Sequence, residues 1–403
     1  MLAFAKRLLR DESGNALMIG AAFMPLLLGA AGLAVDTIQL GVWKRELQRA
    51  ADSGAVAGAY SLAQGGTPAE AVGRDLDQNS FPALSGDEVV QVGARAGFDQ
   101  AVHVELTAER ALPFMSLFVE DAPVIRANAT AALVSDGVFC VLSLYNGDDA
   151  GIDVNGNANV NLGCGMATNS RAQQSITAGG SSLITASPLM SVGGLVGSAN
   201  NFADETVLQP HSAEQRDPFA YLPDPPAQSG CIDAVIEEGP ESELSPGCYN
   251  SLTISGSVLL NPGTYYVTGD IDFQSKADVR GDGVTFVMTG PGGAAGDLKW
   301  NAQATLNLTA PDDGPYRDVL FYRDRRASNI EIKINGGAEA TLSGAFYFPT
   351  SDITFAGHAG LQVRCFQMVG QILRFRGTAD LVNSCDDRPE LPGFNLNFVR
   401  LVG

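Results

Sequence analysis

Positive charge and histidine are scarce in this sequence. Its 403 residues include 25 Lys and Arg against 45 Asp and Glu, which gives a formal net charge of −20 at pH 7, and only three His. Nucleic-acid backbones are bound by clustered positive charge, so the composition excludes a nucleic-acid-binding function. The excess of acidic residues otherwise indicates only a well-solvated surface.

Sequence signatures of metal sites and common catalytic sites are also missing. His103, His211 and His358 are far apart and lack the H-E-x-x-H spacing, and neither a G-x-S-x-G nor a G-x-x-x-x-G-K motif occurs. No two cysteines have the C-x-x-C spacing typical of zinc and thioredoxin-like sites. We therefore expect a protein that is not an enzyme and that binds no metal and no cofactor.

Charge is absent from residues 16–35, an apolar run near the N-terminus. At ~1.5 Å per helical residue the run is ~30 Å long, the hydrocarbon thickness of a bilayer. Lys6, Arg7 and Arg10 precede it, and basic flanks stay in the cytoplasm. The pattern predicts a cytoplasmic segment 1–15, a single-pass anchor 16–35 and an exported body. A cleavable secretory signal is the alternative, although its apolar core is shorter, at ~7–15 residues.

The helical pattern continues beyond Asp36 as a stripe of mostly small residues. The stripe recurs at intervals of three or four and consists of Trp43, Leu47, Ala50, Gly54, Gly58 and Leu62. Small residues allow another backbone to approach closely. Two interpretations remain open: the stripe packs on its own domain, or it bundles with helices of partner proteins.

A second pattern overlaps this stripe and carries a resemblance. It consists of Asp11, Gly14, Val35, Asp36, Leu47, Gln48, Ala50, Ala51 and Asp52. This combination resembles the N-terminal motif of the TadE/TadG-like proteins of Flp (tight-adherence, Tad) pilus assembly. The resemblance implies a bacterial inner-membrane protein with a periplasmic body that helps to build or present a pilus used in surface adhesion. It also implies other pilus-assembly membrane proteins as partners, with homo- or hetero-oligomers formed through the N-terminal helix.

One position departs from the pattern of pilin-like subunits. Those subunits are cleaved after a glycine and carry a Glu five residues later, whereas Ile19 stands five residues after Gly14 here. A buried Glu would need a charged partner in lipid, such as the new N-terminal amine of a neighbouring subunit. Its absence predicts an uncleaved, permanently anchored protein and not a subunit of the pilus shaft.

The sequence pattern of residues 36–136 predicts a helix followed by a small α+β module. A helical segment at 69–81 precedes three segments with the apolar–polar alternation of half-buried strands, at 88–96, 101–109 and 124–134. An apolar stretch, ALPFMSLFVEDAP, separates the last two. The family resemblance implies that this order forms the helix-plus-sheet module of pseudopilin-like proteins.

The sequence pattern of residues 137–390 predicts an all-β domain. The predicted fold class of the chain is therefore α+β followed by all-β. Short strand signals alternate with Gly, Asn, Asp and Ser at irregular intervals. We predict a parallel β-helix, in which stacked rungs bury one continuous core, with a β-sandwich as the second choice. A proline-rich loop at about 200–241 crosses or caps the coil, and Phe219, Tyr221 and Leu222 are candidates to plug its end or flank. Residues 391–403 are a C-terminal tail.

Six cysteines lie beyond the predicted anchor. They are Cys140, Cys164, Cys231, Cys248, Cys365 and Cys385. An even number in an exported chain favours disulfides in an oxidising periplasm, and six cysteines allow fifteen connectivities. We predict pairing between sequence neighbours, 140 with 164, 231 with 248 and 365 with 385. In the chain-entropy model, each bridge would contribute ~3 kcal/mol to the stability of the folded chain.

Two other functions fit parts of the sequence. A surface adhesin would bind glycans through one face of the β-helix. A polysaccharide-cleaving enzyme would place carboxylates and arginines side by side on that face, and the candidates are Asp318, Arg323, Asp324, Arg325 and Arg326. A charge cluster at a strand end is more commonly a solvated edge that prevents strand pairing, and that is the interpretation we favour.

Overall fold

The computed structural model describes residues 14–79, 88–301, 303–336, 340–357, 360–384 and 394–403. The chain divides into two compact units. Unit 1 comprises Met1–Val134 with Val399–Gly403, and unit 2 comprises Ser135–Phe398. Strand β3, Val124–Ser143, contributes to both. Each unit is described separately.

Unit 1 contains one very long helix. Helix α2, Gly14–Ala63, includes the predicted anchor and the small-residue stripe without a break, and Pro25 lies inside it. The helix ends where Gly65 takes a positive φ of 75°, a conformation that favours glycine. Thr67 and Pro68 then start the amphipathic helix α3, Pro68–Gln78, with proline at a position where its missing N–H costs nothing.

A three-stranded antiparallel sheet completes unit 1. Strands β1, Val89–Arg95, and β2, Phe98–Glu109, form a hairpin, and β2 pairs with β3 from Ala101 opposite Ala132 to Glu109 opposite Val124. The short 3-10 helix η1, Met115–Leu117, lies in the loop between β2 and β3. Val402 donates its backbone N–H to the Thr130 carbonyl, so the C-terminal residues join this sheet. The sequence identified residues 391–403 only as a tail, but they include strand β29, Phe394–Leu401.

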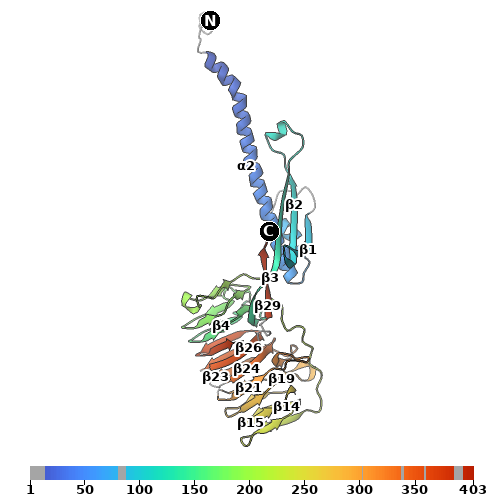
Figure 1. The fold of residues 1–403 in the computed structure, drawn as a ribbon, viewed down its shortest axis with the longest axis vertical. Helices are drawn as coiled ribbons and strands as arrows, with labels where there is room; N and C mark the ends of the chain where they lie inside the picture. Colours follow the sequence, from blue (N-terminus) through green and yellow to red (C-terminus); the bar gives the residue numbers. More distant parts are fainter. Residues whose placement is uncertain (1–13, 80–87, 302, 337–339, 358–359, 385–393) are drawn as a thin grey trace, which may run out of the picture. The chain divides into compact units, whose positions relative to one another are not determined.

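Unit 2 is a parallel β-helix, as predicted, and each of its described strand pairs is parallel; the β-sandwich alternative is wrong (Figure 1). Its first strands after β3 are β4 Ile152–Val154, β5 Asn159–Asn161, β6 Gly165–Thr168, β7 Ile176–Ala178, β8 Leu183–Thr185, β9 Leu189–Ser191, β10 Leu195–Val196 and β11 Leu208–Gln209, with the 3-10 helix η2 Ala199–Asn201 before β11. The later strands are β12 Ile232–Ile236, β13 Ser242–Leu244, β14 Gly247–Ile254, β15 Ser257–Leu260, β16 Gly263–Val267, β17 Ile271–Phe273, β18 Asp278–Gly281, β19 Val284–Met288, β20 Leu298–Trp300, β21 Thr305–Thr309, β22 Val319–Arg323, β23 Glu331–Gly336, β24 Ala340–Phe348, β25 Asp352–Gly357, β26 Gly360–Gly370, β27 Leu373–Gly377 and β28 Asp380–Ser384, with the 3-10 helix η3 Pro291–Gly293 after β19.

The chain enters the coil in its interior and not at an end. Val141 of β3 pairs with Met166 of β6 on one side and with Met368 of β26 on the other. From this first rung the chain winds through β6 and β9 to β11, then crosses to the opposite end at β12, and winds back until β26, β27 and β28 pair with β3, β4 and β5. Figure 1 shows the green and red rungs meeting side by side. We call this contact between the first and last rungs the seam.

One corner of the coil near the seam consists of stacked glycines. Gly377, Gly156 and Gly180 follow one another on adjacent rungs and have φ values of 80°, 83° and 67°. A Cβ on Gly180 would lie 2.7 Å from the Gly156 carbonyl oxygen, and one on Gly156 would lie 2.9 Å from that of Gly377. Only glycine allows both this backbone conformation and this close approach.

One sheet of the coil is buried on both faces. Strands β19 and β22 are buried at every position, which explains why their sequences, VTFVM and VLFYR, are mostly apolar and do not alternate. Alternate residues point into the coil, where Phe286, Phe321 and Phe346 form an aromatic column with centroid distances of 5.1 and 4.9 Å. The residues between them point outward and pack in a second cluster with Phe219 and Leu222.

The proline-rich segment therefore covers a flank of the coil as the chain crosses from β11 to β12. Phe219 packs on Tyr347 with a centroid distance of 5.3 Å, and the Tyr347 hydroxyl donates to the Asp217 carboxylate at 2.6 Å. Phe219 and Leu222 are buried, as the sequence analysis allowed, whereas Tyr221 is 71% exposed. Proline suits this segment because its backbone forms no regular ladder.

We expect Phe321→Ala to lower the free energy of unfolding of unit 2 by ~3–5 kcal/mol, because it opens a cavity in the aromatic column. Tyr221→Ala removes an aromatic ring of similar size from the surface and should change the free energy of unfolding by less than ~0.5 kcal/mol. Denaturant unfolding followed by the fluorescence of Trp300, which packs on Phe273 in the same core, measures both. An equal decrease in the free energy of unfolding of the two variants would contradict this account of the core.

Candidate functional site

The C-terminal half of α2 buries the small-residue stripe inside unit 1. The stripe residues Leu47 and Ala50 are at most 5% exposed and belong to one core with residues of α3, β2 and β3, and Trp43 and Leu62 are partly buried against it. Three neighbouring alanines of α2 lie in the same core, Ala51, Ala55 and Ala59. The structure thus agrees with the first of the two interpretations, in which the stripe packs on its own domain. The proposed contact of the same residues with partner helices stays a prediction, and it would require this core to open.

The two glycines of the small-residue stripe, Gly54 and Gly58, permit this packing. A Cβ on Gly58 would lie 2.8 Å from Cγ1 of Val102, closer than real Cβ contacts allow, and 3.0 Å from Cγ2 of Val72, which is also unusually tight. A Cβ on Gly54 would lie 3.3 Å from Cγ1 of Val72. Helix α2 therefore approaches both α3 and β2 closely because glycine occupies these positions.

Two polar motif residues fix the helix against the sheet. The Gln48 amide donates to the Asp52 carboxylate at 2.8 Å and to the backbone carbonyl of Asn128 in β3, also at 2.8 Å. Asp52 thus orients Gln48 so that it can bind the strand. Nearby, the guanidinium of Arg110 lies over the ring of Trp43, 5.0 Å from its centroid, in a cation–π contact.

Asp36 forms the third polar contact of α2. Its side chain is only 4% exposed, and its carboxylate accepts backbone hydrogen bonds from Met115 at 2.6 Å and Phe114 at 3.3 Å. One turn earlier on the same face, Gly32 lies under the ring of Phe114, whose Cγ would be 2.6 Å from an added Cβ. Asp36 and Gly32 together hold the loop between β2 and β3 against α2.

The N-terminal half of α2 has a different character. Apart from Gly32, the described side chains from Met18 to Val35 are exposed, and they include Leu26, Leu27 and Leu28 at 63–69% exposed. Within the described residues, α2 is the one helix long and apolar enough to cross a membrane. From Asp36 on, one face of the helix packs on unit 1 through Leu40, Trp43 and Leu47, while Ile38 and Val42 on other faces stay exposed.

Two of the three predicted disulfides are present in the structure. Cys140 pairs with Cys164 and Cys231 with Cys248, with Cα–Cα distances of 5.9 and 4.6 Å. The third prediction, Cys365 with Cys385, involves Cys385, which lies outside the described residues, and it stays a prediction.

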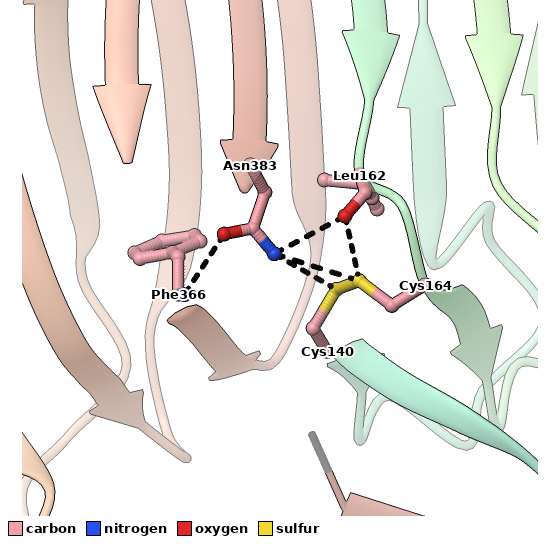
Figure 2. Close-up of a disulfide and its surroundings, with 5 residues drawn as sticks. All are labelled: Cys140, Leu162, Cys164, Phe366 and Asn383. Carbon is pink, nitrogen blue, oxygen red and sulfur yellow. Dashed lines mark hydrogen bonds between the residues drawn. A yellow bond between two sulfur atoms is a disulfide. The ribbon is translucent and has the colours of Figure 1, made fainter. Parts of the chain in front are cut away.

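The disulfide between Cys140 and Cys164 lies at the seam. Figure 2 shows the Asn383 amide pointing at it from β28. This amide donates to the Leu162 carbonyl at 3.1 Å, lies 3.7 and 3.6 Å from the sulfurs of Cys140 and Cys164, and accepts from the Phe366 backbone N–H at 3.0 Å. One side chain of the last rung thereby binds the first rung and its disulfide.

The charged cluster considered for glycan cleavage belongs largely to the interior. Arg323 and Asp324 are 0% exposed, so the favoured interpretation of a solvated edge is wrong for both. Arg323 donates to the carbonyls of Ala295 and Ser328 at 3.1 and 2.9 Å, among other acceptors. Asp324 accepts from Thr289 at 2.7 Å and from Arg326 at 2.6 Å. Asp318 instead forms an ion pair with its neighbour Arg317 at 3.1 Å.

The other two arginines of the cluster hold the proline-rich segment. Arg325 donates to the carbonyls of Ala220 and Leu222 at 3.2 and 3.0 Å, and Arg326 donates to that of Pro225 at 3.4 Å. These contacts are structural. Across the described ranges, no group of three His, Cys, Asp or Glu residues has the geometry to hold a metal ion.

Sequence reasoning missed Phe114 and Met115 as hydrogen-bond partners of Asp36, and it missed the contact between Phe114 and Gly32. The available signal was the apolar segment 111–123, which has the length of a loop and too many apolar residues for a solvated one. Nothing in the sequence indicated that the segment packs on α2.

These features define a protein with a long N-terminal helix, a helix-and-sheet unit and a parallel β-helix. Residues 14–61 match the profile of the family described as putative Flp pilus-assembly TadE/G-like, at the position where the sequence resembled it. The N-terminal segment is therefore of the TadE/G-like type. No curated protein and no solved structure matches the chain.

We expect Gly58→Leu to destabilise unit 1 by ~1–3 kcal/mol, because the new side chain overpacks the contact with Val72 and Val102. Gly41→Leu is the matched control on the same helix, since nothing lies within 4 Å of a Cβ at Gly41. It should be neutral or stabilise the helix by up to ~1 kcal/mol. Faster hydrogen exchange of β2 amides in the first variant alone is the expected result; unchanged exchange would mean that the stripe does not pack on β2 in solution.

The lowered pKa of the Asp324 carboxylate predicts that the stability of unit 2 depends on pH. Burial by itself raises its pKa, but the hydrogen bonds from Arg326 and Thr289 outweigh burial and leave the pKa below its ordinary value. Stability from the ionised form is therefore present above the unfolded pKa of ~3.9 and is lost as pH falls through the folded pKa.

Asp324→Asn should cost ~1–3 kcal/mol at neutral pH and reduce the loss of stability on acidification below about pH 4. Asp313→Asn, at an exposed carboxylate, is the control and should leave both quantities unchanged. Unfolding curves measured over a range of pH test this. An acid-induced loss that is identical in the parent and in Asp324→Asn would show that another group causes it.

Proposed function

We propose that this protein is a non-enzymatic, membrane-anchored component of Flp/Tad-type pilus assembly, with a periplasmic body. Its N-terminal segment matches a family described as putative Flp pilus-assembly TadE/G-like, which supports the pilus-assembly part of this role. The observation that carries the proposal is the difference between the two parts of α2: an exposed apolar stretch of bilayer length before Asp36, and beyond it a helix face that packs on its own sheet.

The proposed orientation follows from charge. Lys6, Arg7 and Arg10 precede the apolar stretch and favour a cytoplasmic N-terminus, which supports a periplasmic location for Asp36 and the residues after it. The two disulfides fit an oxidising compartment. The small-residue stripe is buried in unit 1. Partner helices of the assembly would therefore contact α2 through its exposed residues between Met18 and Val35.

The proposed role of unit 2 is that of a rigid spacer or recognition surface without catalysis. Its parallel rungs share one continuous core, and a disulfide holds the seam. The charged residues that best resembled a catalytic face, Arg323 and Asp324, use their hydrogen-bonding capacity inside the fold. A coil with one continuous core suits an element that presents or guides other proteins.

Cell fractionation combined with intact-mass spectrometry tests the proposal. We expect the full-length chain in the inner-membrane fraction. A Leu27→Arg, Leu28→Arg double variant should leave that fraction, because each Arg at the centre of a span costs ~2.5–3.5 kcal/mol. Val42→Arg, at an exposed position beyond Asp36, is the matched control and should stay.

Two outcomes would overturn the proposal. A chain that begins at Asn15 and is recovered in sheared pili would make the protein a processed subunit. A chain released from the cell surface, with no inner-membrane pool, would favour the glycan-binding adhesin.

A further inference from the structure

The loop between β2 and β3 exposes an unusual number of large apolar side chains. Phe118 is 85% exposed, Leu117 is 72% exposed and Val119 is 42% exposed, and all three are consecutive in the chain. Single exposed apolar residues are ordinary on protein surfaces, but a contiguous group marks a surface that contacts something apolar.

This loop is held at a defined level along α2. The Asp36 carboxylate binds the backbone of Phe114 and Met115, and the ring of Phe114 lies on Gly32. Asp36 is the first charged residue after the apolar run 16–35. Gly32 lies one turn, ~6 Å, further into that run. The loop is therefore fixed beside the point where the proposed anchor leaves the hydrocarbon.

We infer that the tip of this loop, Phe114 to Val119, inserts into the lipid surface beside α2 and forms a second membrane contact. The inference rests on the proposed membrane anchor. The exposed apolar surface of the tip is continuous with that of α2, because Phe114 contacts Gly32 directly. A bilayer that surrounds residues 16–35 reaches the level of this ring, so the lipid surface is the partner that fits.

The charges around the tip limit the depth of insertion. Glu120 and Asp121 follow it directly and are exposed, and carboxylates are costly to bury in hydrocarbon. On the side of α2 beyond Asp36, Trp43 and Arg110 form their cation–π pair. An aromatic ring that lies beside a cation suits the headgroup region. The tip therefore inserts only to the boundary between headgroups and acyl chains.

This second contact has a mechanical consequence for unit 1. A single helix in a bilayer can tilt and rotate, and interfacial anchors determine which tilt it adopts. Two contacts joined by the Asp36 hydrogen bonds fix the tilt of α2 and, with it, the orientation of the sheet of unit 1 on the membrane.

Tryptophan probes in the full-length chain, reconstituted into phosphatidylcholine vesicles, test this inference. Phe118→Trp reports on the tip, Leu27→Trp on the anchor, and Val92→Trp on an exposed apolar position of β1, which is 51% exposed and pairs with Val102 far from the tip. Each is compared with the parent chain, whose Trp43 and Trp300 give a constant background. Quenching by lipids brominated on the acyl chain reports burial in the membrane, and quenching by acrylamide reports exposure to water.

We expect Phe118→Trp to be quenched by brominated lipid, less strongly than Leu27→Trp, and to be shielded from acrylamide, whereas Val92→Trp shows the opposite. Leu117→Trp is a second probe of the tip should Phe118→Trp fail to fold. If Leu27→Trp is quenched by brominated lipid but both tip probes respond only to acrylamide, the loop inference is wrong and the anchor stands. If Leu27→Trp also responds only to acrylamide, the anchor itself is wrong.

Discussion

The structure of unit 1 depends on the buried carboxylate of Asp36. Helix α2 has one uninterrupted backbone but two surroundings, an exposed apolar surface before Asp36 and a packed protein core after it. A carboxylate that is 4% exposed needs hydrogen-bond donors, and the backbone of the loop between β2 and β3 supplies them. The residue that ends the apolar run is thus also the residue that joins the helix to the loop between β2 and β3.

Unit 2 has a comparable constraint in its seam. A chain that starts in the interior of a coil must leave one end, cross to the other and return, and its last rung must match the first in register. Asn383 and the disulfide between Cys140 and Cys164 hold this match, and the stacked glycines 377, 156 and 180 allow the rungs to approach there. The proline-rich segment provides the crossing, and Arg325 and Arg326 bind it through its carbonyls.

The sequence predicted the structural features that depend on local sequence patterns. It did not predict the contacts between residues that are distant in the chain. The apolar run, the three strands of unit 1, the parallel coil and two disulfide pairs follow from composition and spacing. The burial of Arg323 and Asp324 does not, since charged side chains at a strand end ordinarily face water, and the acceptors of Arg323 come from segments as far away as Ala295. The seam and the contact of Phe114 with Gly32 likewise join residues whose proximity no periodicity encodes.

The motif of the TadE/G-like segment is accounted for largely by contacts within unit 1. Leu47, Ala50 and Ala51 are core residues, and Gln48 binds β3 with the help of Asp52. A motif that specifies internal packing identifies a module, not the surface through which the module acts. Most of the exposed large apolar side chains among the described residues of unit 1 lie on α2 before Asp36 and at the loop tip beside it. Contacts with lipid and with partner helices therefore have to be sought at these residues, which the motif leaves exposed.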